Sequence, residues 1–540
     1  MRNNVMLSID KHSKIVLLVS ITLMCIWYMR SPFGSYWING GDAWVDGAVI
    51  TSVENAKRIG WQATKFFPIR GVAFDIDQIS LNPKLGYSYV YTHWPSGYEW
   101  VAYFLDRFGI ITLTGHRLVM LLFSLIGLSM WSIVWARLSN YKTGIYFFSL
   151  SCLSYWYLTW SITLGYWLPY IMFLSGIQLY IWLIPGRWPA SRLVLAWLMM
   201  LITSLFSLQL LPWSIVVLGG LVLYRRINLN WSQIALLMTA PVFGIGSLFY
   251  RIYLLSKDYG IDEISSRFVE RTNWFKFLFS GEYYSLLFLR IEYYLGFGIT
   301  FLICFYVVQL VKENKLFSIS DFDVLWLVTT FGGMVWWFLF PQQHAEHPGT
   351  IVLFAIPQTV LWVKFISGDF GLFFSKVFNK RFLFLIFGLG LLARLTIGYF
   401  NNIVHIPNQL SKETVSGVCA TDGMMMPAIQ SLVGVPCPHV GSTRFGGDNL
   451  SWTIDDCDGE LKTGYFLHFD YVPRVNIPGL DNLYVLYYRW RNSDKEFGNF
   501  QVSQQFDLSG QSDVKVIWEQ GVVSMYYPVQ YCVSGDYNPW

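Results

Sequence analysis

The sequence predicts a mainly α-helical membrane protein, a polytopic bundle of about eleven transmembrane helices followed by a C-terminal α+β domain outside the membrane. Three observations predict this class. Of the 540 residues, 54% are hydrophobic and only 13% are charged, whereas soluble domains carry about 25% charged residues. Apolar runs with the length of a membrane span recur through residues 1–400. Residues 401–540 carry the alternating pattern of β-strands instead.

The first expected span is an uncleaved helix. The apolar run 15–29 follows Arg2, Lys11 and Lys14, and no small-residue cleavage site comes after it. Basic residues in front of a first span predict a cytoplasmic N-terminus. Several later runs are short or contain Pro or Gly, so the number of spans is approximate. The expected spans are 15–29, 117–136, 143–163, 167–184, 193–209, 212–224, 232–250, 295–311, 324–340, 350–366 and 382–400.

The positive-inside rule gives this map an orientation. The short connections expected on the cytoplasmic side carry Lys or Arg, whereas 164–166, 210–211 and 341–349 carry neither. With an odd number of spans, the tail lies on the side of the membrane opposite to the N-terminus. We therefore expect a bacterial inner-membrane protein with its N-terminus in the cytoplasm and its C-terminal domain in the periplasm.

The two expected domains, 1–400 and 401–540, differ in charge and in cysteine use. The first has a net charge of +11 and the second a net charge of −7. The four cysteines of the tail form no C-x-x-C pair, so two disulfides are expected in this exported domain rather than a zinc site, with all three pairings open. Strand patterns at 465–471 and 483–488 predict a small β-containing domain. The four cysteines are Cys419, Cys437, Cys457 and Cys532.

The first extracytoplasmic segment, 31–113, carries two carboxylates just after the first span. Asp46 stands at the N-cap position of an amphipathic helix expected over 49–60, and Asp42 lies four residues before it. We expect this helix to lie along the membrane surface and a second interfacial helix to follow Pro95. The structural alternative is that Asp46 only caps the helix and that Asp42 is a hydrated turn residue.

Two later segments are rich in polar groups. The connection 341–349 holds two histidines and a glutamate, and such crowding in a short loop favours a binding pocket over hydrated loop residues. A metal site made of these histidines and an acid is also open, although no zinc motif spacing is present. The segment 251–294 is basic and aromatic, which suits a phosphate at the headgroup plane; a solvated amphipathic helix is the alternative.

Together these features resemble the GT-C class of membrane glycosyltransferases, and more closely the branch of protein O-mannosyltransferases and lipid A aminoarabinose transferases. The stretch 46–60 resembles the acidic motif that this branch has after its first span, with Ile50 where an aromatic residue usually stands. The stretch 91–98 resembles its Tyr-x-His/Lys-Pro-Pro-Leu-x-Tyr segment, with Trp94 in place of the first proline. The start of the second span and the histidine-containing loop before Pro357 also agree.

The resemblance covers 15–130 well, 320–360 loosely and none of 401–540. It implies transfer of a single sugar from a polyprenyl phosphate to an acceptor hydroxyl on the extracytoplasmic face, with inversion. It implies Asp46 as the general base, with Asp42 as the runner-up. Residues expected at the donor phosphate or lipid are His93, Arg117, Arg251, Lys257, Arg267 and Arg271. Residues expected in the sugar or acceptor pocket are Tyr91, His344, Glu346 and His347.

The expected partners are a polyprenyl-phosphate sugar donor, an acceptor protein, lipid or glycan, and membrane lipids, with the chain acting as a monomer. No cofactor is expected, and a divalent metal is not favoured because this branch does not generally need one. Nucleic acid is not expected, because no basic run with interleaved aromatics is present. Three other functions stay open, namely an O-antigen-type polymerase or ligase, a transporter of lipid-linked sugars, and a receptor whose tail binds a ligand.

Overall fold

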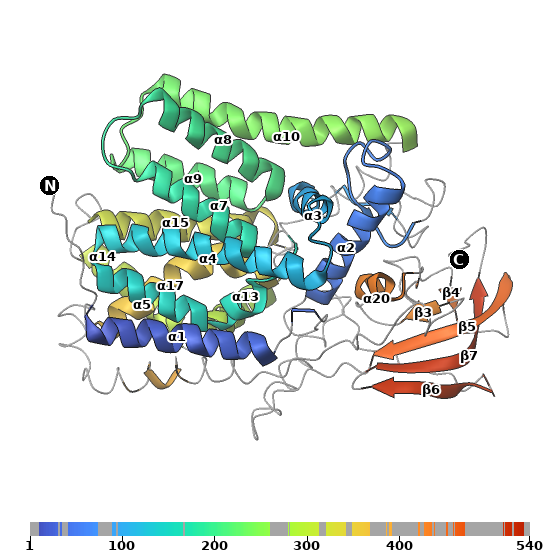
Figure 1. Cartoon of the computed structure of the whole chain (residues 1–540). Coiled ribbons are helices and arrows are strands. Elements are labelled where there is room, and N and C mark those ends of the chain that lie inside the picture. The colour runs from blue at the N-terminus through green and yellow to red at the C-terminus, as the bar shows by residue number, and fades with distance from the viewer. Residues whose placement is uncertain are drawn as a thin grey trace.

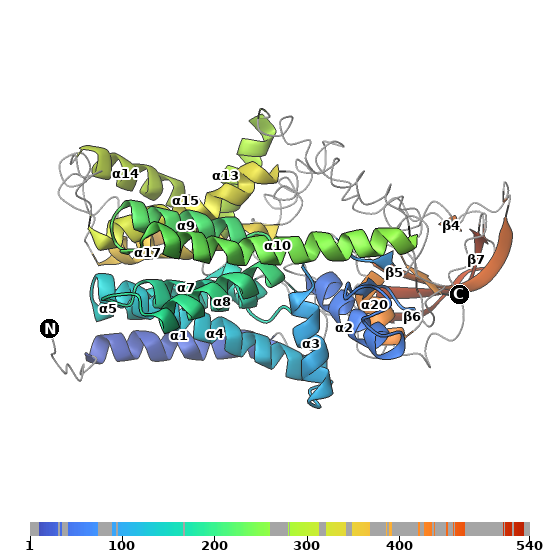
Figure 2. The same ribbon diagram turned by 90° about the horizontal axis from the view of Figure 1, so that it is seen from above.

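The structure is a computed structural model of the 540-residue chain. A helical bundle fills one side of the molecule and a small sheet lies beyond one of its ends, with α2 (Asp42–Arg58) and α3 (Gly97–Arg107) between them (Figure 1, Figure 2). We call the end of the bundle nearest to this sheet the sheet-side end. The structure describes residues 10–30, 33–34, 42–73, 89–92, 95–165, 168–259, 279, 281–296, 298–312, 320–341, 348–367, 385, 388–390, 392, 419–421, 426–434, 437, 450–451, 457, 459–469, 511, 513–520 and 523–533.

The chain is an integral membrane protein. Among the described residues, five helices are long and apolar enough to cross a bilayer, and four shorter apolar helices accompany them. The total of eleven spans stays a prediction, because most of the run 382–400 lies outside the described residues. The helices of the bundle are α1 (Lys11–Arg30), α4 (Leu113–Leu138), α5 (Tyr141–Leu153), α6 (Tyr155–Trp160), α7 (Leu168–Trp182), α8 (Ala190–Phe206), α9 (Leu210–Leu223), α10 (Trp231–Tyr259), α13 (Gly281–Leu295), α14 (Ile299–Lys312), α15 (Asp321–Leu339), the 3-10 helix η3 (Pro348–Ile351) and α17 (Val352–Ile366).

One expected span, 143–163, is not a single helix. The chain forms α5 and then the short helix α6, with Ser154 in an extended conformation between them. The Ser154 hydroxyl donates to the Ser151 carbonyl at 2.6 Å, and residues 161–165 leave the helix as turns. Hydropathy alone does not reveal this break, since apolar side chains occupy both helices.

Glycines allow α4 and α7 to touch backbone to backbone. A Cβ at Gly127 of α4 would collide with the backbone of Met172 in α7, and a Cβ at Gly176 would lie 2.6 Å from the Gly127 carbonyl oxygen. Small residues at such contacts are typical of helices packed inside a membrane. Buried tryptophans, among them Trp131 and Trp213, fill the core beside this contact. The two helices therefore form a close-packed support for the elements at the sheet-side end.

The helix that carries Asp46 differs from its prediction in extent and in surroundings. This helix, α2 (Asp42–Arg58), begins before Asp46, which therefore lies inside the helix and not at its N-cap. The reason is an apolar stripe that repeats every four residues and packs together with side chains of α3. Nearly all of 45–56 is buried, so α2 is packed within protein rather than lying along the membrane surface. The stripe consists of Val45, Val49 and Val53.

The helix expected after Pro95 is confirmed as α3 (Gly97–Arg107). Gly109 follows its end with a φ of +86°, a conformation that glycine adopts without strain. One side of α3 is buried against α2, whereas Phe104 and Phe108 are 59% and 83% exposed. Together with the exposed Ile111 they form an apolar edge that leads directly into α4. This edge lies where a membrane-crossing helix begins.

Within the described residues of the C-terminal domain, five strands form one sheet. In it β7 pairs antiparallel with β4, β5 and β6, while β3 pairs parallel with β5. The strand expected at 465–471 is confirmed by β5, and the one expected at 483–488 lies outside the described residues. The strands are β3 (Cys419–Thr421), β4 (Leu450–Ser451), β5 (Glu460–Phe469), β6 (Lys515–Gln520) and β7 (Val523–Val533).

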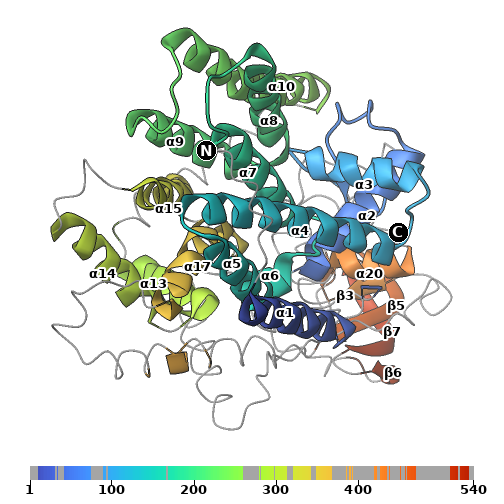
Figure 3. The same ribbon diagram turned by 60° about the vertical axis from the view of Figure 1, so that its left-hand side comes forward.

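Two disulfides are present in this domain, as predicted, and they select one of the three pairings. Cys419 is bonded to Cys437, and Cys457 is bonded to Cys532. The helix α20 (Met426–Val433) lies between the two cysteines of the first disulfide along the chain. It packs against α2, so the C-terminal domain meets the segment between α1 and α4 there (Figure 3).

Candidate active site

An ion pair between Asp46 and Arg117 is buried at the sheet-side end of the bundle. Arg117, near the start of α4, donates from Nε at 2.9 Å and from Nη2 at 2.6 Å to Asp46 Oδ2. Both side chains are only 1% exposed. The Leu164 N–H, in the turns after α6, donates to Asp46 Oδ1 at 2.8 Å, and Arg117 Nη1 donates to the Phe33 carbonyl at 3.0 Å. The pair thus joins four segments that are distant in the sequence.

The environment of Asp46 determines when it could accept a proton. Burial raises the pKa of this carboxyl above its usual range, while the Arg117 guanidinium and the Leu164 N–H act in the opposite direction. Three hydrogen bonds already occupy most of the roughly four acceptor positions of this carboxylate, so release from Arg117 would make it more available as a base. A phosphate competes well for an arginine, because it offers the same two-oxygen geometry as a carboxylate.

A second buried ion pair joins Arg70 and Glu99. Arg70 Nη2 donates to Glu99 Oε1 at 2.6 Å and to the Tyr98 hydroxyl at 2.8 Å, and the two charged side chains are 3% and 0% exposed. The Arg70 guanidinium also lies 4.5 Å from the centre of the Tyr91 ring. Glu99 Oε2 is buried and has no hydrogen-bond partner among the described residues. Burial raises the pKa of Glu99 to about 7, although the nearby Arg70 opposes this rise.

The backbone that carries Arg70 is fastened to α2. There β1 (Ile69–Arg70) pairs with β2 (Tyr89–Val90). The Asn55 amide donates to the carbonyls of Ile69 at 3.1 Å and of Gly71 at 2.6 Å, and it accepts from the Ala73 N–H at 3.0 Å. The buried Asn55 side chain thereby satisfies backbone groups on both sides of Arg70, as a neighbouring strand would do.

Arg251, in the last third of α10, is a buried cation that has no counter-ion among the described residues. Its guanidinium lies 4.6 Å from the centre of the Phe67 ring and 5.2 Å from that of Trp100, and Nη1 donates to the Phe66 carbonyl at 3.2 Å. The residue is 8% exposed, and its Nε and Nη2 atoms are buried with no partner among the described residues. The turn that it contacts holds Lys65 and Phe66 at φ of +52° and +66°, where non-glycine residues are strained.

The structure brings some of the predicted site residues together and leaves others apart. Asp46 meets Arg117, and Tyr91 lies under Arg70, whereas Arg251 contacts the 66–67 turn and Trp100. Lys257 is exposed on α10, with its ammonium 4.7 Å from the centre of the Tyr253 ring. Outside the described residues lie His93, Arg267, Arg271, His344, Glu346, His347 and the side chain of Asp42.

Arg70 and Glu99 were not predicted as site residues. Both are single charges inside apolar stretches, Arg70 within 66–73 and Glu99 within 98–103. A lone charge in such an apolar stretch indicates a buried partner, because an unpaired charge is costly to bury. That signal was available, but the sequence does not show that the two residues are partners.

No group of three or more His, Cys, Asp or Glu side chains that could hold a metal occurs among the described residues. The histidines of the 341–349 connection lie outside them. The metal site considered from the sequence therefore stays an open expectation.

Comparison with known proteins gives matches among solved structures only. No protein-family model and no curated protein sequence matches the chain. The structure is similar to ArnT from Cupriavidus metallidurans in the apo state, with a TM-score of 0.48 and 14% identity over 96% of this chain and 98% of that chain. It is similar to the same protein bound to undecaprenyl phosphate, with a TM-score of 0.44 and 11% identity over 97% and 99% of the two chains.

A further match is the archaeal oligosaccharyltransferase AglB from Archaeoglobus fulgidus, in complex with an inhibitory peptide and a dolichol-phosphate. Its TM-score is 0.44 and its identity 9%, over 78% of this chain and 63% of that chain. The chain is thus similar to GT-C membrane glycosyltransferases, in agreement with the resemblance drawn from the sequence. Because these TM-scores are below 0.5, the proposals below rest on the contacts within this chain.

Proposed function

We propose that this chain is a glycosyltransferase that moves a single sugar from a polyprenyl-phosphate donor to an acceptor hydroxyl, with inversion. The observation that carries this proposal is the buried Asp46–Arg117 pair, which places a carboxylate and a guanidinium together at the sheet-side end. Sugar transfer from a phosphate needs both groups, a base for the acceptor proton and a cation for the leaving phosphate.

The pair also suggests an order of events. The donor phosphate binds Arg117 in place of the Asp46 carboxylate, which frees Asp46 to face the acceptor hydroxyl. The hydroxyl oxygen then forms a bond to the anomeric carbon while the bond from that carbon to the phosphate oxygen breaks. The hydroxyl proton moves to Asp46, and the polyprenyl phosphate leaves as an anion with the bonding electrons. Substrate binding thus prepares the base, which limits reaction with water.

Arg251 supplies a second cation for the lipid-linked donor. Its charge has no counter-ion among the described residues, and the Phe67 and Trp100 rings lie close to its guanidinium. An anion that reaches this guanidinium therefore gains charge-assisted hydrogen bonds without displacing a carboxylate. We assign Arg251 to the phosphate or headgroup end of the donor.

The site belongs to the extracytoplasmic face in this proposal, and the membrane is a bacterial inner membrane. Two disulfides support this orientation, because structural disulfides form in oxidising compartments such as the periplasm. The absence of Lys and Arg from the short connections expected on that side agrees with it. Both buried pairs contain residues of α2 or α3, the helices that lie between bundle and sheet (Figure 1).

The test uses the purified full-length chain in phospholipid vesicles with a panel of undecaprenyl-phosphate-linked hexoses and pentoses and a periplasmic extract as the source of acceptors. We expect release of undecaprenyl phosphate together with labelled product for one donor. Asp46→Asn should reduce turnover by at least about 100-fold, the usual contribution of a general base. The matched control is Glu54→Gln, a half-exposed carboxylate on the same helix, which should keep full activity.

Full turnover by Asp46→Asn would contradict the proposed base. Movement of a donor across the bilayer without transfer would indicate a transporter instead. Addition of whole glycan blocks rather than one sugar would indicate a polymerase or ligase.

A further inference from the structure

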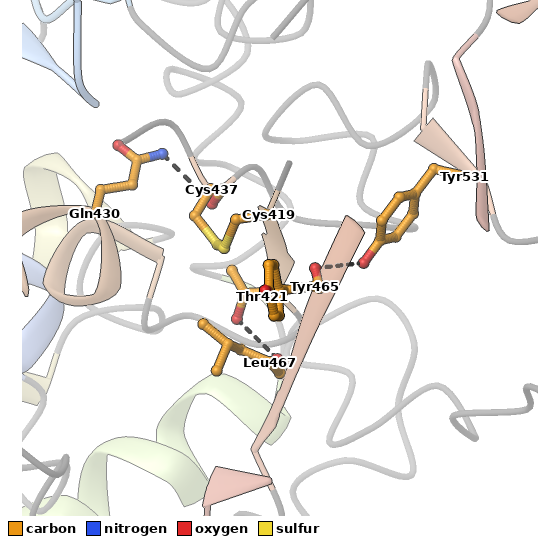
Figure 4. Close-up of a disulfide and its surroundings, with 7 residues drawn as sticks. All are labelled: Cys419, Thr421, Gln430, Cys437, Tyr465, Leu467 and Tyr531. Carbon is orange, nitrogen blue, oxygen red and sulfur yellow. Dashed lines mark hydrogen bonds between the residues drawn. A yellow bond between two sulfur atoms is a disulfide. The ribbon is translucent and has the colours of Figure 1, made fainter. Parts of the chain in front are cut away.

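A buried glutamine of the C-terminal domain is hydrogen-bonded to the segment that follows α2. Gln430, on α20, is fully buried, and its Oε1 accepts from the Val72 N–H at 2.9 Å. Its Nε2 donates to the Cys437 carbonyl at 3.4 Å, next to the Cys419–Cys437 disulfide (Figure 4). The glutamine therefore links a disulfide-anchored part of the C-terminal domain to the backbone two residues after Arg70.

The segment 69–73 is held from two sides. On one side Ser52 of α2 donates to the Ile69 carbonyl at 2.9 Å and Asn55 pairs with three backbone groups, as described above. On the other side Gln430 accepts the hydrogen bond from the Val72 N–H. A small crevice next to this junction is lined in part by Thr51, Asn55 and Gln430. Loss of the glutamine contact would thus loosen the segment without unfolding it.

We propose that Gln430 is a positioning residue, through which the C-terminal domain holds the segment 69–73 and thereby places Arg70 against Glu99. The inference rests on the proposed function only for its activity measurement. Its physical consequence is that the distance between the Arg70 guanidinium and the Glu99 carboxylate depends on a domain that contributes neither residue.

The pH at which Glu99 loses its proton depends on the distance between its carboxylate and the Arg70 guanidinium, so this pH can be used to follow the distance. Among the described residues, the titratable groups that face Glu99 are Arg70 from β1, Tyr98 from α3 and Tyr170 from α7. Arg70 is the cation among them, and a nearby cation favours the ionised carboxylate. When Arg70 moves away, Glu99 should stay protonated to a higher pH. The pH at which Glu99-dependent stability is lost should then rise.

The experiment compares three variants of the full-length chain in detergent. Gln430→Met keeps the side-chain volume and removes both hydrogen bonds. Gln430→Glu keeps an acceptor for the Val72 N–H and should lie closer to the wild type. The matched control is Gln511→Met, which removes an equivalent pair of bonds to the backbone of Gln530 within the same domain. The measurements are amide hydrogen exchange over 69–73 and the pH dependence of the unfolding temperature, each with and without Glu99→Gln.

In Gln430→Met we expect amide exchange at Val72 and Ala73 to become about tenfold faster, as for the loss of one buried hydrogen bond. We also expect the Glu99-dependent transition to move to higher pH, whereas Gln511→Met leaves both measurements unchanged. Faster exchange with an unmoved pH transition would show that Gln430 holds Val72 but does not position Arg70, and would overturn the inference. Unchanged exchange would overturn it as well.

The activity measurement separates this inference from the proposed function. If the wild type transfers sugar, Gln430→Met should lower kcat several-fold with little change in KM. If the wild type transfers no sugar while both physical measurements behave as expected, the proposed function fails and the positioning role stands.

Discussion

The two buried ion pairs at the sheet-side end differ in how completely they are satisfied. Asp46 accepts three hydrogen bonds on its two oxygens, and its partner Arg117 has a further bond to backbone. Glu99 has one buried oxygen without a partner among the described residues and a pKa raised to about 7. The first pair fastens segments together, and in the proposed reaction a competing anion opens it. In the second pair, the Glu99 carboxyl changes its charge near neutral pH.

The largest expected effect comes from breaking the satisfied pair. Arg117→Met leaves the Asp46 carboxylate buried without its cation and should cost about 3–5 kcal/mol of stability. The double variant Asp46→Asn/Arg117→Met should recover most of this loss, since no unpaired charge then remains. Both variants should be inactive if Asp46 is the base. The unfolding temperature in detergent and the turnover of the donor measure the two effects.

Recovery of activity together with stability in the double variant would mean that the pair is only structural. A single Arg117→Met variant as stable as the wild type would contradict the burial of the pair itself.

The second pair should respond to pH. The pKa of Glu99 is raised from its usual value of 4.5 to about 7, so its contribution to stability is fully present below pH 4.5 and is lost as the pH rises through about 7. The unfolding temperature of the wild type should therefore fall between pH 5 and pH 8. Glu99→Gln should flatten this dependence, and the control Glu54→Gln should keep it. A slope that survives Glu99→Gln would assign the dependence to another group.

Unlike Arg117 and Arg70, Arg251 has no acidic partner among the residues that the structure describes. Arg251→Gln should weaken the binding of undecaprenyl phosphate by about tenfold or more, because a hydrogen bond to a charged group contributes about 1.5–3 kcal/mol. The expected change is in KM rather than in kcat. The matched control is Arg137→Gln at the other end of α4, where the arginine is paired with Tyr180. Equal loss of binding in the control would indicate a general charge effect.

The smallest effect is expected from an exposed cation. Lys257→Ala should change undecaprenyl phosphate binding by less than about 1 kcal/mol, since exposed charges are screened by water and salt. The difference from wild type should vanish at high salt. A loss as large as that of Arg251→Gln would show that Lys257 lies closer to the bound phosphate than its exposed position indicates.

The sequence predicted the membrane class, α3, the two disulfides and the β5 strand, because each leaves a local signal in hydropathy, proline, cysteine or alternation. It was wrong about α2 and about the span 143–163. The extent of α2 depends on packing against α3, and the break at Ser154 depends on one backbone torsion. Neither property can be inferred from the amino-acid composition. The roles assigned to the site residues stay predictions.

The partners of the buried charged groups also could not be predicted from the sequence. Asp46 and Arg117 were both named from the sequence, but under separate roles, and their contact spans 71 residues. Arg70 and Glu99 were missed although their charges are conspicuous in apolar surroundings. Residue type and spacing indicate that a buried charge needs a partner. The identity of that partner is seen only in the folded structure.

The exposed apolar edge of α3, formed by Phe104, Phe108 and Ile111, has a kinetic consequence for the proposed reaction. A lipid-borne donor would meet the protein along this edge by moving within the plane of the bilayer, so the search is two-dimensional. Turnover should then follow the mole fraction of donor among the lipids and not its amount per volume of solution. Diluting the vesicles in buffer should leave the rate per protein unchanged, whereas diluting the donor with inert phospholipid should lower it.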